Sequence, residues 1–369
     1  MPIKPFHVLH IDSAREYRGG QNQVRTLMAG LQHVPRLRQT LVVRSGSRLA
    51  REALDLGVEV RSVRWGGAVD AAALVGLVRT LREEWDVVHT HDSHALQSVL
   101  VARGLVGRSA PLIASRRVDF PVRRPGIWRR ADRIVAVSRY IREVLVLQGI
   151  EQSRIEVVHS GIDPADLIPP RAGVLRAAAG TAPAQLLVAA VGALVPHKDH
   201  ATFIRASSIV AASQSNVHFA VFGEGPLHGS LKALVSEVGL ENRFCLAGHV
   251  PDTARSLGDI DIFVMPSREE GLGTACIEAM MAGLPIVATK AGGLGELAGN
   301  AFRPVEPGCP EALAREIERL LGAPGVREAA GLEAKQRSDS FSAETMVMAT
   351  LRCYEEIAHQ TPMSAPMAP

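Results

Sequence analysis

Hydrophobic and polar residues follow two alternating patterns along the chain. Short apolar runs rich in Val, Ile and Leu are separated by longer segments in which apolar residues recur every three or four positions. Runs of the first kind are typical of strands buried within a parallel sheet, and segments of the second kind are typical of helices that cover such a sheet. The sequence therefore predicts an α/β protein with doubly wound parallel sheets.

Both halves of the chain show this strand and helix rhythm. The predicted strands are 6–11, 39–43, 58–63, 86–89, 111–115, 133–137 and 155–158 in the first half, and 186–192, 217–222, 243–247, 260–265 and 285–289 in the second. The clearest predicted helices are 23–34, 71–84, 138–149, 201–213, 227–239, 274–283 and 311–322. A chain of 369 residues exceeds the usual size of a single core, so we expect two domains.

A proline-rich segment separates the two predicted domains. Residues 161–185 contain the adjacent pair Pro169 and Pro170 and show no strand pattern, which is typical of an interdomain linker. We place the first domain at 1–165 and the second at 166–340, and we expect a helix near 340–358 to pack back on the first domain. The polar, proline-containing end at 359–369 is predicted to be disordered.

Composition and charge narrow the function classes. No apolar run approaches the roughly 20 residues that span a bilayer, the start lacks the pattern of a signal peptide, and four widely separated cysteines form no zinc-binding spacing. We therefore expect a cytoplasmic protein without an integral membrane segment. Residues 1–170 hold 25 Lys and Arg against 17 Asp and Glu. The arginines are dense between Ser115 and Arg133. Such a basic surface suits a phosphorylated sugar or anionic lipid headgroups as a binding partner, or it is only a solvated face. Nucleic acid is the least favoured partner, because no nucleic-acid-binding motif accompanies the arginines.

Glycines follow several predicted strands directly before a helix, where backbone N–H groups can approach a phosphate. These turns contain Gly19 and Gly20, then Gly192, then Gly223 and Gly225, and finally Gly271 and Gly273. A single pair is weak evidence, but four at the carboxyl ends of strands indicate the edge at which open α/β sheets bind ligands. Glu270 and Glu278 flank the last turn, and Glu278 lies on an otherwise apolar helix, where a carboxylate requires a partner.

The stretch HTHDSH, residues 89–94, resembles a metal site in composition. His89 and His91 would point to the same face of a strand, and histidine with aspartate is a usual ligand set for zinc. Binuclear metallohydrolases of the β-lactamase type carry the order H-x-H-x-D-H, whereas Asp92 here comes directly after His91. We therefore expect no metal site and interpret His91 as a residue at the strand end, with Asp92 beside it.

Taken together, these motifs resemble the GT-B-fold retaining glycosyltransferases of family 4, the group 1 glycosyltransferases. The most specific element is E-x7-E, here Glu270-GLGTACI-Glu278, followed by AMMAGLPIVAT and AGGLGEL. Further stretches that agree with the family pattern are GALVPHKDH, FGEGP, LAGHV, RGGQ and VVHTHD. The resemblance implies two Rossmann-like domains that face each other across a cleft, with a nucleotide diphosphate sugar on the second domain and the acceptor on the first.

The resemblance also implies roles for individual residues. It assigns Glu278 to the ribose hydroxyls, Glu270 to the donor sugar and Lys198 to the diphosphate, and it makes His91, Glu270 and Lys198 the candidate catalytic residues. Further donor-site candidates are Gly20, Gly192, Gly223, Val250, Gly271, Leu272, Gly273 and Thr274, and acceptor-site candidates are Arg15, Arg18, Asp92, Arg116 and Arg117. Ala193 and Ser160 depart from the Arg and Asn that the family often has there.

The expected activity is retaining, metal-independent hexosyl transfer from a UDP-sugar or GDP-sugar, with no cofactor. The basic first half suggests an anionic acceptor of the cell envelope, such as lipopolysaccharide core, a polysaccharide or a lipid-linked glycan, and peripheral association with the inner face of the cytoplasmic membrane. Alternatives are a nucleotide-sugar epimerase of the same fold, a non-catalytic nucleotide-binding protein and, remotely, a metallohydrolase that uses the HTHDSH stretch.

Overall fold

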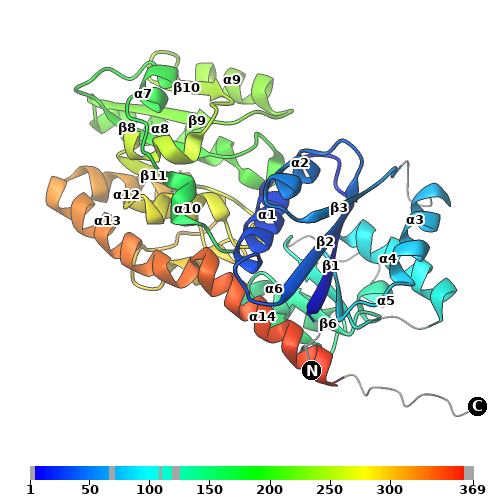
Figure 1. Ribbon diagram of the computed structural model, residues 1–369. Helices are drawn as coiled ribbons and strands as arrows, with labels where there is room; N and C mark the ends of the chain where they lie inside the picture. The colour runs from blue at the N-terminus through cyan, green and yellow to red at the C-terminus, as the bar shows by residue number, and fades with distance from the viewer. Residues whose placement is uncertain (1–4, 66–70, 108–109, 119–124, 361–369) are drawn as a thin grey trace, which may run out of the picture. The chain divides into compact units, whose positions relative to one another are not determined.

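The structure, a computed structural model, describes residues 5–65, 71–107, 110–118 and 125–360 (Figure 1). The chain divides into two compact units. The first unit contains the residues up to Gly161 together with those from Ala343 onward, and the second contains Ile162–Ser342. Each unit has its own parallel sheet, which confirms the expected α/β class.

The first unit is built on a sheet of seven parallel strands in the order β3-β2-β1-β4-β5-β6-β7. Its strands are β1 (Phe6–Asp12), β2 (Leu37–Arg44), β3 (Glu59–Val63), β4 (Val87–Thr90), β5 (Leu112–Arg116), β6 (Arg133–Ala136) and β7 (Ile155–Val157). Its helices are α1 (Gly19–Leu31), α2 (Arg48–Asp55), α3 (Ala71–Leu81), α4 (Ser93–Val106), α5 (Pro125–Trp128), α6 (Arg139–Leu147) and the last helix, α14 (Ala343–Gln360). The strand order reverses between β1 and β4, the position at which doubly wound sheets open a crevice for ligands.

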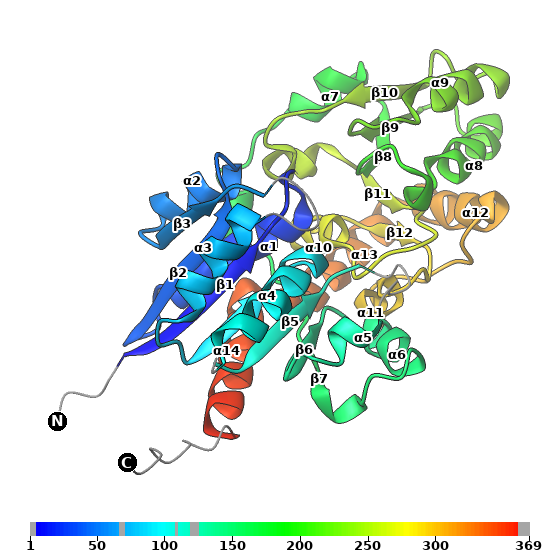
Figure 2. The same cartoon turned by 90° about the vertical axis from the view of Figure 1, so that its right-hand side faces the viewer.

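Helices cover both faces of this sheet. In Figure 1, α1 and α2 lie on one side and α3 and α4 on the other, and Figure 2 shows α3 and α4 side by side. Helix α14 packs against α1 and β4 and contributes Met346, Val347 and the fully buried Tyr354 to the core that contains Val8 and Leu27. The last helix of the chain therefore forms part of the first unit.

The second unit contains a sheet of five parallel strands in the order β10-β9-β8-β11-β12. Its strands are β8 (Leu186–Val191), β9 (Val217–Phe222), β10 (Phe244–Gly248), β11 (Ile262–Met265) and β12 (Ile286–Ala288). Its helices are α7 (Val174–Ala179), α8 (His200–Ser213), α9 (His228–Glu237), α10 (Thr274–Met281), α11 (Leu294–Ala298), α12 (Pro310–Leu321) and α13 (Pro324–Ser338), with short 3₁₀ turns η2 (Pro164–Leu167), η3 (Pro196–Lys198), η4 (Thr253–Asp259) and η5 (Asp339–Phe341). Here the order reverses between β8 and β11.

Three parts of the chain differ from the sequence prediction. Within the predicted linker 161–185, the structure forms α7, because the Asp259 carboxylate accepts hydrogen bonds from the backbone N–H of Gly173 and Leu175 at 2.6 and 2.8 Å. Helices α2, α4, α5, α11 and α13 were not among the predicted helix ranges. Helix α14 extends to Gln360, so the first two residues of the predicted tail are helical, and 361–369 lie outside the described residues.

Candidate active site

Most of the predicted donor residues follow β8 and β11, the two strands between which the order of the second sheet reverses. Lys198 is the last residue of η3, six residues after Gly192, and Glu270 lies in the loop after β11. The Lys198 ammonium forms an ion pair with the Glu270 carboxylate, and only 20% and 16% of the two side chains are exposed. Ser267 Oγ lies 3.4 Å from the same carboxylate oxygen. A cation and an acceptor for hydroxyl groups thus stand together at the ligand-binding edge.

Directly after Glu270, the chain turns sharply into α10. Gly271 and Leu272 are buried, and Gly273, at φ +95°, immediately precedes the first helical residue, Thr274. A Cβ atom at Gly273 would lie 2.5 Å from Leu294 Cδ2, so this turn requires glycine both for its backbone angle and for space. Cys276 N–H, the third of α10, already donates to the Gly273 carbonyl oxygen at 3.0 Å. The N–H groups before it lie at the positive end of the helix dipole, which suits a phosphate.

Glu278 is the fifth residue of α10 and is only partly exposed. Burial, and to a smaller extent the nearby Asp166 carboxylate, raise the pKa of Glu278 to about 7. Glu278 therefore holds a proton more readily near neutral pH than an ordinary glutamate does. Glu278 can accept hydrogen bonds, and a ligand that donates hydrogen bonds to its carboxylate favours the ionised form.

Most of the predicted glycine turns bring backbones into close contact with one another. A Cβ atom at Gly223, which has φ +150°, would lie 2.1 Å from the Gly192 carbonyl oxygen, and one at Gly293 would lie 2.2 Å from the Gly271 carbonyl oxygen. Glycine therefore lets the loop after β9 pack on the loop after β8, and the loop after β12 pack on the loop after β11. Val250 is buried, and its carbonyl accepts a hydrogen bond from Thr253 Oγ1 at 2.6 Å.

In the first unit, the loop after β1 is tied to the loop after β4. Asp92 Oδ2 accepts from the Ser13 N–H at 2.7 Å, while Oδ1 accepts from the Ser13 hydroxyl and from the backbone N–H groups of His94 and Ala95, so that Asp92 caps α4. The His94 ring lies 3.0 Å from Ser13 Oγ. Asp92 and His94 thus have structural partners, and HTHDSH does not form a ligand cluster of its own residues.

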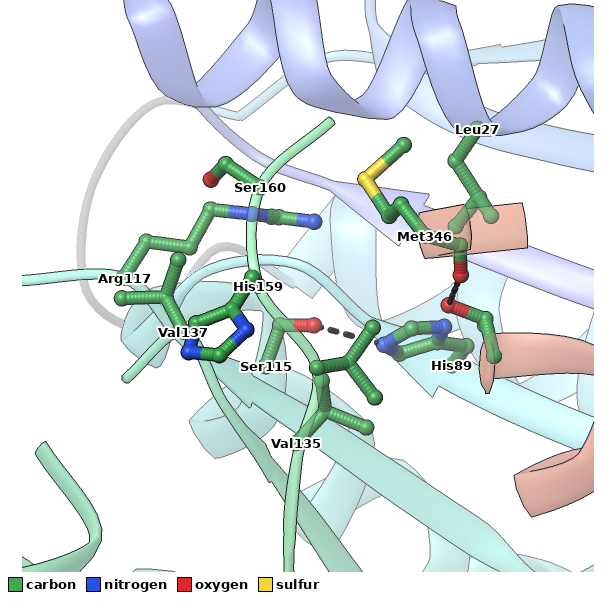
Figure 3. A pocket seen from close by; sticks show the side chains of 11 residues that line it. Leu27, His89, Ser115, Arg117, Val135, Val137, His159, Ser160 and Met346 are labelled. Carbon is green, nitrogen blue, oxygen red and sulfur yellow. Dashed lines mark hydrogen bonds between the residues drawn. The ribbon is translucent and has the colours of Figure 1, made fainter. Parts of the chain in front are cut away.

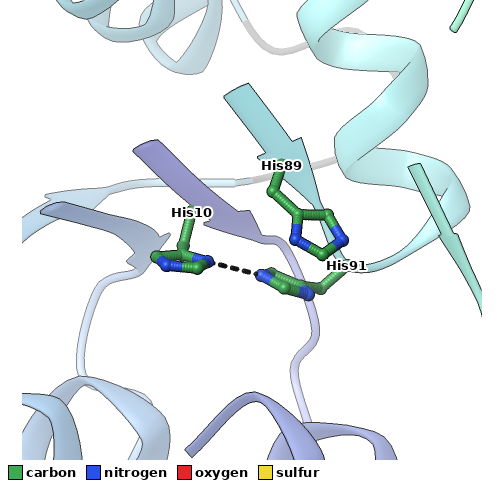
Figure 4. Close-up of side chains that lie close together, drawn as sticks. All are labelled: His10, His89 and His91. Atoms are coloured by element: carbon green, nitrogen blue, oxygen red, sulfur yellow. Dashed lines mark hydrogen bonds between the residues drawn. The ribbon is translucent and has the colours of Figure 1, made fainter. Parts of the chain in front are cut away.

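Two histidines of HTHDSH meet a third from the neighbouring strand (Figure 4). His10 of β1, His89 of β4 and His91 directly after β4 are buried, and one ring nitrogen from each lies within 4.8 Å of the others. His10 Nδ1 and His91 Nε2 are 3.0 Å apart. His89 Nδ1 lies 2.6 Å from the Tyr354 hydroxyl and its Nε2 lies 2.7 Å from Ser115 Oγ. Burial lowers the pKa of all three rings, which keeps them neutral at neutral pH.

Arg117 lies beside this cluster. Its side chain reaches a cavity of about 20 Å³ that His89, Ser115 and His159 also line (Figure 3), which is room for about one water molecule. Arg117 Nη1 lies 3.4 Å from the His91 carbonyl oxygen. Burial lowers the pKa of Arg117, and the carboxylates of Asp12 and Asp92 oppose this shift.

The other predicted acceptor residues are spread over the first unit. Arg116, the last residue of β5, is buried with its guanidinium carbon 5.5 Å from the Trp128 ring centroid, so it packs on α5. Arg15 and Arg18 are exposed, and Arg18 forms an ion pair with Glu16. Gly20 lies in the first turn of α1. The structure therefore brings Arg117 and Asp92 near His91, whereas Arg116 is buried against Trp128.

Comparison with known proteins identifies the family. Residues 175–337 match the family described as Glycosyl transferases group 1, and residues 17–166 match Glycosyltransferase Family 4. A 2-deoxystreptamine glucosyltransferase of Streptomyces kanamyceticus is 30% identical over 354 residues, which cover 86% of this chain and 89% of that protein. The chain belongs to the group 1 glycosyltransferases of family 4.

Other relatives and solved structures agree with this assignment. A D-inositol 3-phosphate glycosyltransferase of a Mycobacterium species is 32% identical over 58% of this chain, a match that spans 48% of the relative's length. The crystal structure of Anabaena HepE in complex with UDP and glucose has a TM-score of 0.81 at 18% identity, covering 95% of this chain and 100% of that one. A Rickettsia africae glycosyltransferase has a TM-score of 0.82 at 19% identity and covers 97% and 100%. The likeness to these structures confirms the GT-B fold.

The sequence interpretation missed several polar residues of this glycosyltransferase. Asp12 at the end of β1 is buried, accepts hydrogen bonds from Ala14 N–H and Gln21 Nε2, and has a pKa raised to about 6 by burial and by Asp92. His10 pairs in register with His89 across β1 and β4. The sequence feature that could have indicated these two residues is the presence of a histidine and an aspartate in the otherwise apolar run FHVLHID. Tyr354 gave no such signal, because its contact depends on the return of α14.

Proposed function

We propose that this glycosyltransferase transfers a hexosyl group from a UDP-sugar or GDP-sugar to an anionic acceptor with retention of the anomeric configuration. The observation that carries the proposal is the Lys198–Glu270 ion pair at the start of α10, with Glu278 one helical turn into the same helix. One short segment thus offers a cation for a diphosphate and two carboxyl groups for hydroxyls. This is the set of groups that a nucleotide diphosphate sugar requires.

In the proposed donor complex, Glu278 accepts hydrogen bonds from the ribose hydroxyls and Glu270 accepts them from the sugar. Lys198 and the first N–H groups of α10 stabilise the negative charge that grows on the diphosphate as the bond to the sugar breaks. In the first unit, His91 is placed at the donor sugar. The leaving phosphate takes the acceptor's proton on the same face of the sugar, without a covalent intermediate, as the resemblance to the family implies.

The same residues support transfer without a metal ion. Lys198 supplies a positive charge and α10 supplies fixed dipoles. Together they can stabilise the negative charge of the leaving diphosphate, which a magnesium ion stabilises in other enzymes. Ala193 stands where the family often has arginine, so Lys198 provides more of the positive charge that stabilises the diphosphate.

Arg117 supports the choice of an anionic acceptor, because it places a guanidinium beside the His91 carbonyl at the ligand-binding edge of the first sheet. The proposed acceptors are the phosphorylated or acidic glycans of the cell envelope, namely lipopolysaccharide core, a polysaccharide or a lipid-linked glycan. Two relatives carry names with cyclitol acceptors, 2-deoxystreptamine and D-inositol 3-phosphate. An acceptor panel should therefore include both free cyclitols and their phosphates.

We also propose that the protein associates peripherally with the inner face of the cytoplasmic membrane. Among described residues, no helix has the length and hydropathy to cross a bilayer, and the first 170 residues carry the excess of arginine. Association should be electrostatic and fall as salt rises. Flotation with vesicles that contain anionic lipid should retain the protein at low salt but not at high salt. Equal recovery with neutral vesicles, or none with anionic ones, would contradict this.

The function is tested by donor binding and by the stereochemistry of the product. A thermal-shift panel of nucleotide sugars should single out one UDP-sugar or GDP-sugar, and transfer from it should give a product with the donor's anomeric configuration by NMR. Glu278→Ala should abolish donor binding, whereas Glu318→Ala on α12 should not affect it. An inverted product would refute retention, and full activity of Glu278→Ala would refute the donor site. Binding without any transfer or hydrolysis would favour a non-catalytic protein, and conversion of the donor to its epimer would favour an epimerase.

A further inference from the structure

The segment that carries Lys198 is attached to the loop after β11 on both sides of the lysine. On the N-terminal side, the His197 carbonyl oxygen accepts a hydrogen bond from the backbone N–H of Arg268 at 2.8 Å. On the C-terminal side, the Asp199 carboxylate accepts one from Nε of the same arginine at 2.7 Å. Arg268 is therefore bonded to both sequence neighbours of Lys198, to one through its backbone and to the other through its side chain.

Asp199 holds the turn that directs the chain from η3 into α8. Its backbone is left-handed, at φ +45°, a conformation that costs free energy in residues other than glycine and that aspartate adopts more readily than most. Oδ1 accepts from the Thr202 N–H at 3.3 Å and Oδ2 from the Thr202 hydroxyl at 2.7 Å, so the side chain caps α8. Since Oδ2 also accepts from Arg268 Nε, one carboxylate connects the cap of α8 with the loop after β11.

The surroundings restrict the pair that Arg268 forms with Asp199. Only 8% of the Asp199 side chain is exposed, against 57% of the Arg268 side chain. The guanidinium lies against Gly308, where an added Cβ atom would be 2.9 Å from Nη2. A partly exposed ion pair adds little to global stability, because water screens the two charges. We therefore expect its main effect on the local geometry of the turn.

We propose that Arg268 is a positioning residue for Lys198. The Lys198 ammonium is paired with Glu270, which comes two residues after Arg268. The loop after β11 thus holds the head of the lysine through Glu270 and the backbone on both sides of it through Arg268. The inference rests on the proposed function, in which Lys198 stabilises the charge of the leaving diphosphate. Misplacement of such a group by about 1 Å can lower the rate of the chemical step by up to about a hundredfold.

Direct contact of Arg268 with the diphosphate is the competing explanation, because a guanidinium also binds phosphate groups. The contacts favour positioning. Nε of Arg268 is bonded to Asp199, and both terminal nitrogens lie against Gly308. The two roles differ in what they require of the side chain, since positioning needs a hydrogen-bond donor at the place of Nε and direct contact needs the positive charge.

The order of the Lys198 side chain can be measured without any assay of activity. The chain has five lysines, so protein labelled with ¹³C at lysine gives few Cε signals, and Lys198→Arg assigns one of them. The two Hε protons of Lys198 should be resolved in the wild type, because a fixed side chain makes them inequivalent, and should merge in Arg268→Ala. Arg171→Ala is the matched control, because it removes an arginine paired with another aspartate at positive φ, Asp252. Protons that stay resolved in Arg268→Ala, or that coincide already in the wild type, would overturn the inference.

Kinetics separate positioning from direct contact. In Arg268→Gln, the amide nitrogen Nε2 takes the place of arginine Nε and can still donate to Asp199, so kcat should remain within about threefold of the wild type although the charge is gone. In Arg268→Ala, this donor is lost, and kcat should fall by about ten- to thirtyfold while the donor KM changes by less than about threefold. Equal losses of kcat in the two variants would overturn the inference.

A second comparison uses a background that lacks the lysine. In Lys198→Ala, the further change Arg268→Ala should lower kcat by less than about threefold, because a residue that acts through Lys198 has no effect without it. The full ten- to thirtyfold loss in that background would show a direct contact and overturn the inference. If no transfer is found in the wild type, the proposed function fails, and the lysine spectra still decide whether Arg268 positions Lys198.

Discussion

Lys198 and Glu270 form an ion pair although they are 72 positions apart in the sequence. Each belongs to a loop that follows one of the two strands at which the second sheet reverses its order, β8 and β11. The pair keeps both charges in place in the free protein, so neither side chain has to be ordered when the donor binds. In the proposed donor complex, the diphosphate would meet a cation that is already positioned, next to a carboxylate that can accept hydrogen bonds from hydroxyl groups.

Removal of the Lys198 charge should reduce the chemical step more than donor binding. We expect Lys198→Ala to lower kcat by about a hundredfold or more, because one preorganised group that stabilises charge in the transition state contributes about 3 kcal/mol. Donor KM should change less, since Glu278 and the α10 backbone remain. Steady-state kinetics with the donor found in the panel provide the measurement. Arg319→Ala is the matched control, because it removes a cation paired with Glu316 on α12. A change confined to KM would contradict the role assigned to Lys198.

Donor affinity should depend on pH through Glu278. Its pKa of about 7 in the free protein is raised by burial and by Asp166, and hydroxyl donors favour the ionised form, so binding lowers this pKa. Affinity is then full above pH 7 and weakens as pH falls below 7, by up to about tenfold per unit. Calorimetric titration with the nucleotide at pH 8, 7 and 6 measures this.

Two variants separate Glu278 from other titrating groups. Glu278→Gln should bind weakly with little pH dependence. Asp166→Asn should move the onset of weakening to lower pH, because the repulsion that raises the Glu278 pKa is removed. An unchanged pH profile in Glu278→Gln would show that another group is responsible.

Gly223→Ala should disrupt the donor loops through backbone contact alone. The added Cβ would lie 2.1 Å from the Gly192 carbonyl oxygen at a backbone φ of +150°, and we expect a loss of about 3 kcal/mol in the stability of the second unit with weaker donor binding. Gly229→Ala, in α9 with no atom within 4 Å of the added Cβ, should be neutral or slightly stabilising. Thermal unfolding with and without nucleotide compares the two, and equal melting temperatures would contradict the packing argument.

The sequence patterns predicted the strands well because buried parallel strands have a continuous apolar signature. They also placed Lys198 and Glu270 in the loops after strands and Glu278 in the following helix, since strand, loop and helix order determines that much. The patterns did not predict α7, whose start is capped by Asp259, a residue more than 80 positions away. Local sequence carries no record of such a partner.

The histidine cluster was not predicted for the same reason, because it depends on contacts between residues far apart in the sequence. HTHDSH looked like a local ligand motif, but Asp92 caps α4 and the third ring of the cluster comes from His10 on another strand. Which strands become neighbours depends on the reversal of strand order between β1 and β4. That reversal, and the return of α14 that brings Tyr354 to His89, are properties of the assembled unit.

Removal of metal ions should leave activity unchanged if Lys198 and the start of α10 hold the diphosphate charge. After treatment with EDTA and gel filtration, we expect kcat within about twofold of the untreated enzyme, because the stabilising charges belong to the protein. Purified protein analysed by mass spectrometry for metals should contain well under one equivalent. Loss of activity that magnesium or manganese restores would contradict the metal-independent proposal.

Stability should fall in mild acid because buried histidines cannot take up protons in the folded state. The fully buried rings with lowered pKa are His10, His89, His91 and His200. Unfolding exposes them to an ordinary pKa near 6.5, so stability is full above pH 6.5 and is lost as pH falls below it. Asp12 and Glu278 act in the opposite direction, because their raised pKa values make the folded state bind protons first.

The balance of these groups determines how steeply the free energy of unfolding changes with pH. Four histidines gain protons on unfolding and two carboxyl groups lose them, so between about pH 6 and 4.5 the net uptake is about two protons, or about 2.7 kcal/mol per pH unit. Differential scanning calorimetry at constant ionic strength should show the melting temperature dropping by several degrees per unit. His10→Asn removes one titrating group from the balance and should halve the slope, whereas His33→Asn should leave it unchanged. A wild-type slope near zero, or the same slope in His10→Asn, would show that these rings take up protons without unfolding.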